Sequence, residues 1–552
     1  MSDTTQNGPM LAADGTPLKR SLARALRRQK LRALLLVAPL LIFVLVTFIA
    51  PIADMLFRSV ENQIVSDTLP STTEVLADWE HSTGESPPEP VYEALYYDLF
   101  LAAEAKEHTK LGTRLNYEYT GVSSLFRSTG RGLDDLGDDY LDALEEVDDR
   151  WGDGDFWYTL MSGSGEADED LMRAHVKRLR QLTGDALPGK VGFAPSTEIV
   201  ALLPKTTAAY ADFAAYTALV DGDVVAEEDP WESVYVGLMT DLQGADVASY
   251  SGPEAEALQA AAEAAADIEY IPLKTFFGDE DEDWLNADIW ATVQTYSTKY
   301  TSGYFLNAVD LQLTPDGIEA RPENQRIYIM LFKRTMFMSL AITFSCIALG
   351  YPVAWLLANL PASKANLLMI LVLLPFWTSL LVRTSAWKVM LQQQGVINDV
   401  LVWLGLVADG NRLVMINNQF GTIVAMTHIL LPFMILPLYS VMQGIPPSYL
   451  RAAKSLGATN WTAFWRVYFP QSVPGIGAGS ILVFILAIGY YITPEIVGGT
   501  TGTFISNRIA YHISSSLNWG LGAALGAILL AVVLLLYWAY DRIVGIDNVK
   551  LG

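Results

Sequence analysis

Six long stretches without a charged residue constrain this 552-residue chain more than any other feature of it. The first covers 21 residues, 33–53, and the others are 335–363, 365–382, 413–450, 467–494 and 509–540. A helix of about 20 apolar residues crosses the ~30 Å hydrocarbon core of a bilayer. The pattern therefore predicts an all-α integral membrane protein with six transmembrane helices.

The segment before the first stretch is basic. Leu18, Leu22 and Leu26 alternate with Lys19, Arg20, Arg24, Arg27, Arg28, Lys30 and Arg32, which is typical of an amphipathic helix on an anionic membrane surface. A cleaved signal peptide is the alternative, but its apolar core would be too long and no clear small-x-small cleavage site follows. We predict a retained anchor with a cytoplasmic N-terminus, preceded by a disordered segment, 1–16.

A large acidic segment separates the first apolar stretch from the second. Residues 58–326 hold 53 acidic and 17 basic residues, a net charge of −36, whereas the rest of the chain has a net charge of +11. Helical patterns at 92–110, 134–150, 168–182 and 254–266 predict a mostly helical folded domain. The positive-inside rule places this domain outside the cytoplasm. Its charge would attract cations, although acidic runs such as 279–283 more commonly serve solubility.

The segment 447–470 predicts two short amphipathic helices between two apolar stretches. Tyr449, Ala452, Ala453 and Leu456 share one helical face, and Gly457 suits the left-handed residue that ends a helix. Asn460 is the expected cap of the second helix, and Pro470 and Pro474 are expected to stop it. Its apolar face comprises Trp461, Phe464, Trp465 and Tyr468. With Arg451, Lys454 and Arg466, these helices predict a cytoplasmic loop that contacts a soluble partner.

This segment resembles the EAA loop of type I ABC-importer permeases. The matching residues are Arg451-Ala452-Ala453, Gly457-Ala458, Phe464 and Pro474-Gly475-Ile476. In that family the loop docks on the ATPase, which implies coupling contacts by Tyr449, Arg451, Ala452, Ala453, Leu456, Gly457 and Ala458. Arg451 stands where the family has glutamate, so the polar part of the contact would differ. The alternative is an ordinary interfacial loop.

The resemblance extends to the spermidine/putrescine permeases. It rests on 350–355, on the Leu374-Pro375-Phe376-Trp377-Thr378 phrase and on 430–439 and 489–499. Glu495 is the only acidic residue between Asp409 and Asp541, and a polyamine would suit one carboxylate with aromatic neighbours. Trp377, Tyr490, Tyr491 and Glu495 are therefore candidate pathway residues. Alternatively, Glu495 is hydrated at the headgroup level, and Trp377 and Arg383 are interfacial anchors.

The resulting division is a basic N-terminus (1–32), a first transmembrane helix (33–57), an acidic extracytoplasmic domain (58–326), a permease core with five transmembrane helices (327–543) and a cytoplasmic tail (544–552). The coupling loop is 444–472. The resemblance implies a multi-pass protein of the bacterial inner membrane that works by alternating access. Its implied partners are two ATPase subunits, a second six-helix permease, a periplasmic solute-binding protein and membrane lipid, but no nucleic acid.

No chemistry of its own is expected from this chain. It has no Gly-x-x-x-x-Gly-Lys-Ser/Thr motif, and its five histidines show no metal-ligand spacing. We therefore predict a transport subunit, not an enzyme, with no cofactor or metal, and with ATP and Mg²⁺ on a partner ATPase. An opine or an amino-acid derivative is the alternative solute. A membrane-anchored binding or sensor protein is the alternative of another class, but no predicted cytoplasmic segment is long enough for a signalling output.

Overall fold

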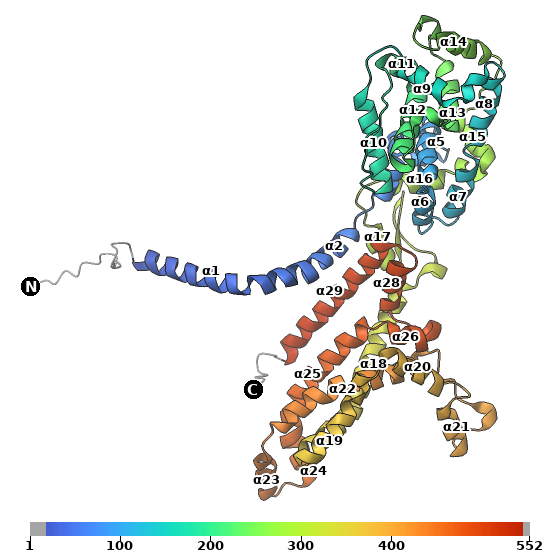
Figure 1. Ribbon diagram of the computed structural model, residues 1–552. Coiled ribbons are helices and arrows are strands. Elements are labelled where there is room, and N and C mark those ends of the chain that lie inside the picture. Colours follow the sequence, from blue (N-terminus) through green and yellow to red (C-terminus); the bar gives the residue numbers. More distant parts are fainter. Residues whose placement is uncertain (1–17, 545–552) are drawn as a thin grey trace, which may run out of the picture.

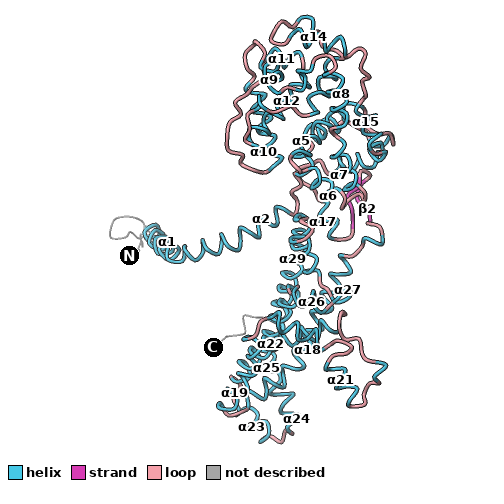
Figure 2. The backbone as a smooth tube through the Cα atoms, turned by 45° about the vertical axis from the view of Figure 1, so that its right-hand side comes forward, coloured by secondary structure: helices cyan, strands magenta, loops and turns pink. Residues whose placement is uncertain are grey.

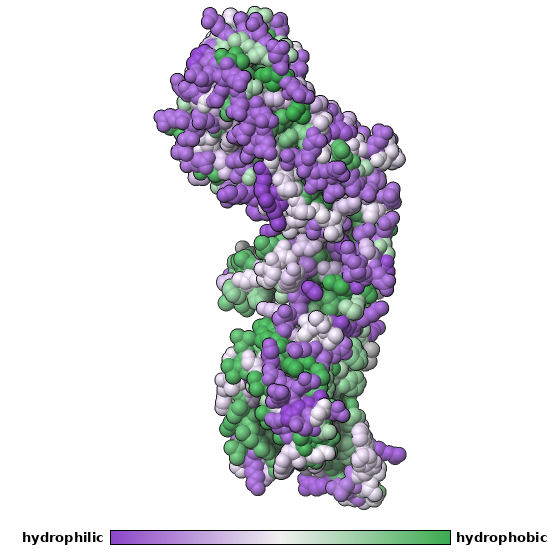
Figure 3. Space-filling model, turned by 90° about the vertical axis from the view of Figure 1, so that its right-hand side faces the viewer, coloured by the Kyte–Doolittle hydropathy of each residue, from purple (hydrophilic) through white to green (hydrophobic). Residues whose placement is uncertain are grey.

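In the computed structural model, which describes residues 18–544, the chain is mostly helical and elongated (Figure 1). The inserted domain, residues 58–326, lies at one end and the helices of the membrane core lie at the other. Hydrophilic side chains cover most of the inserted domain, whereas hydrophobic side chains gather over the membrane core (Figure 3). The predicted disordered segment 1–16 and the predicted cytoplasmic tail 544–552, except Val544, lie outside the described residues.

In the described part of the chain, five helices are long and apolar enough to cross a membrane, namely Gln29–Arg58, Tyr328–Asn359, Gln419–Gln443, Asn460–Gly489 and Trp519–Arg542. The first combines the end of α1 (Leu18–Val44), a π-turn (Leu45–Ile49) and α2 (Ala50–Arg58). It leaves the bundle sideways (Figures 1 and 2), and none of its most apolar window is buried. Its apolar surface is therefore free to contact lipid or another subunit.

The predicted span 365–382 does not form one helix. α19 (Ala362–Leu373) and a 3-10 turn (Leu374–Trp377) meet α20 (Leu380–Met390) at an angle of 94°. Pro375 has no backbone N–H, and Thr378 and Ser379 are extended, with ψ of 146° and 140°, so the helical hydrogen bonds stop there. Residues 18–544 thus contain five single candidate spans, or six if this bent pair counts as one. α21 (Val396–Trp403) follows the pair.

The membrane core is built around α22 (Gln419–Gln443), which packs against α18 (Tyr328–Asn359) and α25 (Phe469–Gly489). A Cβ at Gly475 would lie 3.2 Å from the Leu438 Cα, and one at Gly479 would lie 2.6 Å from the Met434 sulfur. These close approaches require glycine at both positions and let α25 pack tightly against α22. Two short helices, α26 (Ile492–Val497) and α27 (Gly499–Gly502), precede α28 (Ile505–Ser514) and the last helix, α29 (Trp519–Val544).

The inserted domain has a continuous hydrophobic core that includes four fully buried tryptophans, Trp151, Trp157, Trp284 and Trp290. Its helices are α3 (Ile64–Thr68), α4 (Pro70–Leu76), α5 (Glu89–Glu104), α6 (His108–Leu115), α7 (Val122–Gly132), α8 (Asp135–Glu145), α9 (Gly154–Ser162), α10 (Glu169–Thr183), α11 (Thr197–Leu202), α12 (Pro204–Tyr216), α13 (Glu232–Leu242), α14 (Ala255–Ala264), α15 (Leu273–Glu280), α16 (Ala287–Thr295) and α17 (Gly303–Ala308). The four predicted helical patterns all contain helices. The segment is therefore a folded domain.

One hairpin departs from the predicted all-α class. β1 (Leu311–Thr314) and β2 (Gly317–Ala320) pair antiparallel, with Thr314 opposite Gly317. The turn between them contains Pro315 and Asp316, and Gly317 has a φ of +127° that favours glycine. This hairpin is the only sheet in the described part of the chain (Figure 2).

The chain enters and leaves the inserted domain at neighbouring positions. The Asn62 N–H donates to the Lys299 carbonyl at 2.9 Å, and the Thr301 N–H donates to the Val60 carbonyl at 2.8 Å. Below this junction Tyr304, Tyr328 and Leu521 share a small buried cluster. The inserted domain is therefore joined directly to α18 and α29.

Candidate functional site

The predicted coupling loop, 444–472, lies at the end of the core opposite the inserted domain (Figure 1). Its first helix is α23 (Pro447–Ser455), which begins at a proline as predicted. Gly457 has a φ of +88°, its N–H donates to the Lys454 carbonyl, and the Ala458 N–H donates to the Ala453 carbonyl, both at 3.0 Å. These two bonds form a Schellman motif, so the predicted role of Gly457 as the helix stop is confirmed.

The second helix differs from the prediction in two ways. Thr459, not Asn460, caps α24 (Asn460–Ala463), because the Thr459 hydroxyl accepts the Thr462 N–H at 3.2 Å. Pro470 and Pro474 do not stop the helix, which runs on through a π-turn (Phe464–Tyr468) into α25. The π-turn interrupts the regular hydrogen-bond pattern just before Pro470, so its missing N–H is tolerated.

The surface of this loop is unusually apolar. The side chains of Leu456 and Trp461 are 89% and 71% exposed, and Tyr449 is also exposed. Arg451, Lys454 and Arg466 surround them on the surface. Within the described chain none of these three cations lies within 4 Å of a carboxylate. Exposed apolar side chains rimmed by unpaired charge are typical of a protein-interaction surface.

The rear of the loop is fixed to the membrane helices. Phe464 and Tyr468 stack with their ring centroids 5.9 Å apart, and Phe464 also meets the Tyr351 ring of α18 edge-on at 6.2 Å. The Tyr351 and Ser472 hydroxyls lie 2.9 Å apart, which joins α18 to α25. A displacement of the loop would therefore be passed to both helices.

Three of the four candidate pathway residues lie together. Tyr490 and Tyr491 directly follow the end of α25. Glu495 is exposed and lies in the next helix, α26, beyond the end of the apolar stretch 467–494. The Glu495 Oε2 accepts a hydrogen bond from the Asn507 side chain at 2.5 Å, and the same amide donates to the Tyr491 carbonyl at 2.9 Å. Asn507 of α28 thus holds this acidic group in place, a contact that the sequence pattern did not predict.

Trp377 lies apart from this group. Its side chain is 73% exposed at the bend between α19 and α20, and no hydrogen bond or aromatic contact of the described residues joins it to Glu495 or the two tyrosines. Trp377 therefore stays a candidate pathway residue only as an exposed aromatic side chain, separate from the group around Glu495.

A half-buried cation lies close to this region. The Nε and Nη1 atoms of Arg383 in α20 are buried and have no hydrogen-bond partner within the described chain, so the residue stays a candidate both as an interfacial anchor and as a pathway residue. On the same helix, the Trp387 Nε1 donates to the His428 Nδ1 at 3.1 Å, and the Thr384 and Thr493 hydroxyls lie 3.2 Å apart. A cation with buried nitrogens that have no partner often marks a binding site or pathway in a membrane protein.

No group of three or more metal-ligating side chains forms within residues 18–544. Cys346 is buried in the hydrophobic core of the bundle. Within these residues the candidate site thus comprises an exposed apolar loop surface, the helices to which that loop is fixed and a few polar groups.

Residues 331–544 match a family described as "Binding-protein-dependent transport system inner membrane component". The chain is 35% identical over 220 residues to the spermidine/putrescine transport system permease protein PotB of Escherichia coli K12, covering 39% of this chain and 79% of that protein. It is 36% identical to PotB of Salmonella typhimurium LT2, with 39% and 76% covered. The chain belongs to this family of inner-membrane transport components.

This permease is also 33% identical over 260 residues to the inner membrane ABC transporter permease protein YdcU of Escherichia coli K12, covering 45% of this chain and 80% of the relative. Membership makes it a multi-pass permease subunit of an ABC importer, a transport component with no catalytic role of its own. None of the relatives named here is a sensor. All matched residues of the family model lie beyond the inserted domain.

Solved structures show weaker similarity. A bacterial ABC transporter that imports alginate is 20% identical, with a TM-score of 0.32, covering 39% of this chain and 79% of that one. The MetNI methionine ABC transporter is 19% identical, with a TM-score of 0.29, covering 39% and 94%.

Proposed function

We propose that this permease carries polyamines, or a related organic cation, across the bacterial inner membrane. The observation that supports this solute class is the 35–36% identity to two spermidine/putrescine permeases over 220 residues. Glu495 supplies one carboxylate, held by the Asn507 amide that also donates to the Tyr491 carbonyl, and the Tyr491 side chain is exposed; a carboxylate and an aromatic ring suit an amine. The helix that carries Glu495, α26, lies at the end of the core that faces the inserted domain (Figure 1).

The energy of ATP hydrolysis is coupled to transport at the other end of the membrane core, at the loop 444–472. In this proposal the exposed face of Tyr449, Leu456 and Trp461 docks on an ATPase subunit, with Arg451, Ala452, Ala453, Gly457 and Ala458 in the same surface. ATP binding and hydrolysis on two such subunits displace the loop, and the contacts of Tyr351 with Phe464 and Ser472 pass that displacement to α18 and α25. The outcome is alternating access of the solute pathway.

The assembly follows from the same proposal. A second six-helix permease completes the pathway, and a periplasmic binding protein delivers the solute on the side of the inserted domain. The N-terminus and the C-terminal tail then lie in the cytoplasm with the coupling loop, as the basic residues before the first span favour. A solved relative, the alginate transporter, is described in complex with a solute-bound periplasmic protein.

The test is solute uptake by the complex reconstituted in vesicles. We expect saturable, ATP-dependent uptake of radiolabelled spermidine or putrescine, reduced in Glu495→Gln and unchanged in the control Asp409→Asn, an exposed carboxylate of the same chain. Uptake of neither polyamine, with uptake of another solute in the same panel, would reject the proposed class.

A second candidate solute carries a carboxylate, as an opine or an amino-acid derivative does. The unpartnered Arg383 nitrogens favour it, because a guanidinium binds a carboxylate through parallel hydrogen bonds. The same panel separates the two candidates. Loss of uptake of an anionic or zwitterionic solute in Arg383→Gln, with no polyamine uptake in the wild type, would establish the second.

A further inference from the structure

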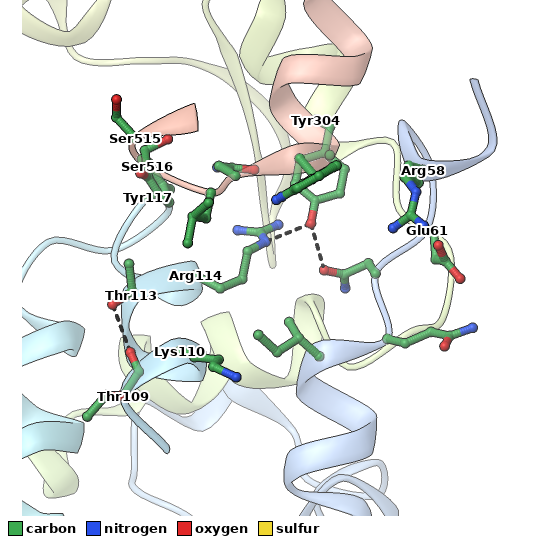
Figure 4. Close-up of a pocket in the computed structure, with 17 residues that line it drawn as sticks. Arg58, Glu61, Thr109, Lys110, Thr113, Arg114, Tyr117, Tyr304, Ser515 and Ser516 are labelled. Atoms are coloured by element: carbon green, nitrogen blue, oxygen red, sulfur yellow. Dashed lines mark hydrogen bonds between the residues drawn. The ribbon is translucent and has the colours of Figure 1, made fainter. Parts of the chain in front are cut away.

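A cavity of about 920 Å³ lies where the inserted domain meets the membrane core (Figure 4). Its walls come from the end of α2 and the segment after it, from α6, from Tyr304 of α17 and from the turn between α28 and α29. Most of the residues that line it carry polar side chains, including the hydroxyl groups of Thr109, Thr113, Ser515 and Ser516. None of the residues proposed for the transport path lines this cavity.

The residues that line this cavity include three cations, Arg58, Lys110 and Arg114, and one carboxylate, Glu61. Each cation is paired with a carboxylate outside the lining, namely Asp54, Glu107 and Glu118. The wall of the cavity therefore presents cationic groups suited to an anion, in a domain whose net charge is −36.

Arg114 gives this cavity a fixed cationic wall. Its side chain is only 7% exposed, its Nε donates to the Tyr304 hydroxyl at 2.9 Å and its Nη1 donates to Glu118 at 2.8 Å. Figure 4 shows the guanidinium extending from α6 toward Tyr304 and the serine turn. The Nη2 is buried and has no hydrogen-bond partner in the described chain. The guanidinium also lies over the rings of Tyr296 and Tyr304, 5.0 and 4.6 Å from their centroids, so Arg114 is held in place and would act on an anion in the cavity through its charge.

Arg58 and Lys110 can be recruited by a ligand. Each pairs with a carboxylate of its own helical surface, Arg58 with Asp54 at 2.9 Å and Lys110 with Glu107 at 2.6 Å. Both cations are about half exposed or more, and exposed pairs contribute little free energy. Breaking either ion pair so that the cation can bind an anion in the cavity therefore costs little free energy.

The position of the cavity identifies the source of the anion. Arg58 is the last residue of the first span and Trp519 begins α29, and the Arg58 guanidinium lies 5.8 Å from the Trp519 ring centroid. Arginine and tryptophan at the ends of two spans are typical of the headgroup level. Just below, α2 exposes the apolar side chains of Ile52, Leu56 and Phe57, which acyl chains can cover.

We propose that this cavity binds the phosphate group of an anionic phospholipid, with Arg58 and Lys110 as its exposed ligands and Arg114 as its buried wall. The lipid would fill the space between α2, α29 and the inserted domain. It would hold the first span, which has few contacts with the bundle, at the junction with the domain. The site lies outside the transport path and outside the coupling loop.

Native mass spectrometry of the full-length protein in detergent tests this proposal. Phosphatidylglycerol and phosphatidylcholine are titrated separately, and inorganic phosphate and glycerol 3-phosphate are then added as competitors. The variant Arg58→Gln/Lys110→Gln is compared with Arg173→Gln/Lys190→Gln, which removes two exposed positive charges from elsewhere on the same domain.

We expect one phosphatidylglycerol molecule to bind at least about tenfold more tightly than phosphatidylcholine, and the Arg58/Lys110 variant to lose about that factor because two charge-assisted contacts are removed. The control variant and an excess of either soluble phosphate should leave binding unchanged. Unchanged affinity in the Arg58/Lys110 variant, or an equal loss in the control, would overturn the site. Displacement by soluble phosphate at the same concentration would overturn its assignment to lipid.

Discussion

The Asp310 side chain caps the helix that begins at Tyr328. Its Oδ1 accepts the Tyr328 N–H at 2.9 Å and the Ile327 N–H at 3.0 Å, and its Oδ2 accepts the Ile329 N–H at 2.9 Å. Asp310 belongs to the inserted domain, whereas Tyr328 begins the first helix of the membrane core. One carboxylate thus satisfies three backbone donors that no helical carbonyl can reach, and the two parts of the chain share a helix end.

Replacing this cap should weaken the protein. We expect Asp310→Ala to lower the free energy of unfolding by about 0.5–2 kcal/mol, the usual cost of losing a helix cap. Asp310 has a φ of +60°, so alanine would also be strained there, whereas asparagine tolerates that conformation and keeps one acceptor oxygen. Asp310→Asn should therefore fall between wild type and alanine in thermal unfolding of the purified full-length chain. Equal melting temperatures for all three proteins would show that the cap does not stabilise the junction.

The sequence predicts the general architecture well because transmembrane spans and helix ends depend mainly on residues that are neighbours in the sequence. Charge-free stretches of sufficient length identify five helices directly, and Gly457 marks the end of α23 because only a residue without a Cβ adopts its φ at no cost. The same local logic is wrong for Pro470 and Pro474, which it predicts to stop a helix, and it does not predict the bend at Pro375. Pro375 divides a predicted span, whereas the other two are accommodated in a continuous helix after a π-turn. The identical residue type has different effects because the neighbouring turns differ.

The sites depend on contacts that sequence spacing does not contain. Glu495 and Asn507 are 12 residues apart, and their pairing follows from the packing of α26 against α28. Trp387 and His428 are 41 residues apart in the sequence but form a hydrogen bond. The cavity between the inserted domain and the membrane core is lined by residues that range from Arg58 to Gly520. Arg383 was visible in the sequence as one cation in an apolar region, but only the packing shows that two of its nitrogens are buried.

The end of α23 should be essential for coupling. Gly457→Pro removes the N–H that bonds the Lys454 carbonyl and forbids a φ of +88°. Leu456→Asp places a charge on the most exposed apolar position of the loop. We expect both variants to insert at normal abundance but to lose solute uptake and stimulation of the ATPase activity.

A matched control tests whether this loss belongs to the loop. Gly184 ends α10 of the inserted domain with a φ of +70°, and its N–H bonds the Arg180 carbonyl at 3.1 Å. Gly184→Pro should affect the stability of the inserted domain and leave ATPase stimulation intact. Normal uptake by Gly457→Pro or Leu456→Asp, at normal membrane abundance, would rule out a coupling role for this helix.

Arg451 gives a test of partner recognition. Its charge is exposed and unpaired in the described chain, so a carboxylate of the ATPase would be its natural partner. Arg451→Glu should weaken assembly with the native ATPase by no more than ~1 kcal/mol if the pair is solvent-exposed. Lys454→Glu, on the same helix, makes the identical charge change three residues away. A measured affinity of the ATPase that is unchanged or improved in Arg451→Glu would show that this position does not recognise the partner.

Glu232 of the inserted domain titrates unusually. Burial raises the pKa of its carboxyl group from the ordinary value of 4.5 to about 6, and the nearby carboxylates of Asp134, Asp138 and Glu104 act in the same direction. The folded protein therefore holds this proton more tightly than the unfolded chain does. The contribution of Glu232 to stability is most favourable below pH 4.5 and is lost as the pH rises through about 6.

Removing this charge should stabilise the protein at neutral pH. Glu232→Gln keeps the shape of the side chain but cannot ionise, so we expect its free energy of unfolding at pH 7 to exceed that of the wild type by about 1 kcal/mol, roughly half the full value of the shift because the side chain is partly solvated. The difference should shrink below pH 6 and vanish near pH 4.5. Glu228→Gln, an exposed neighbour, is the matched control and should show no such trend. Melting temperatures of the full-length chain from pH 4 to 8 measure the effect, and a difference between Glu232→Gln and wild type that is constant across this range would contradict the titration of Glu232.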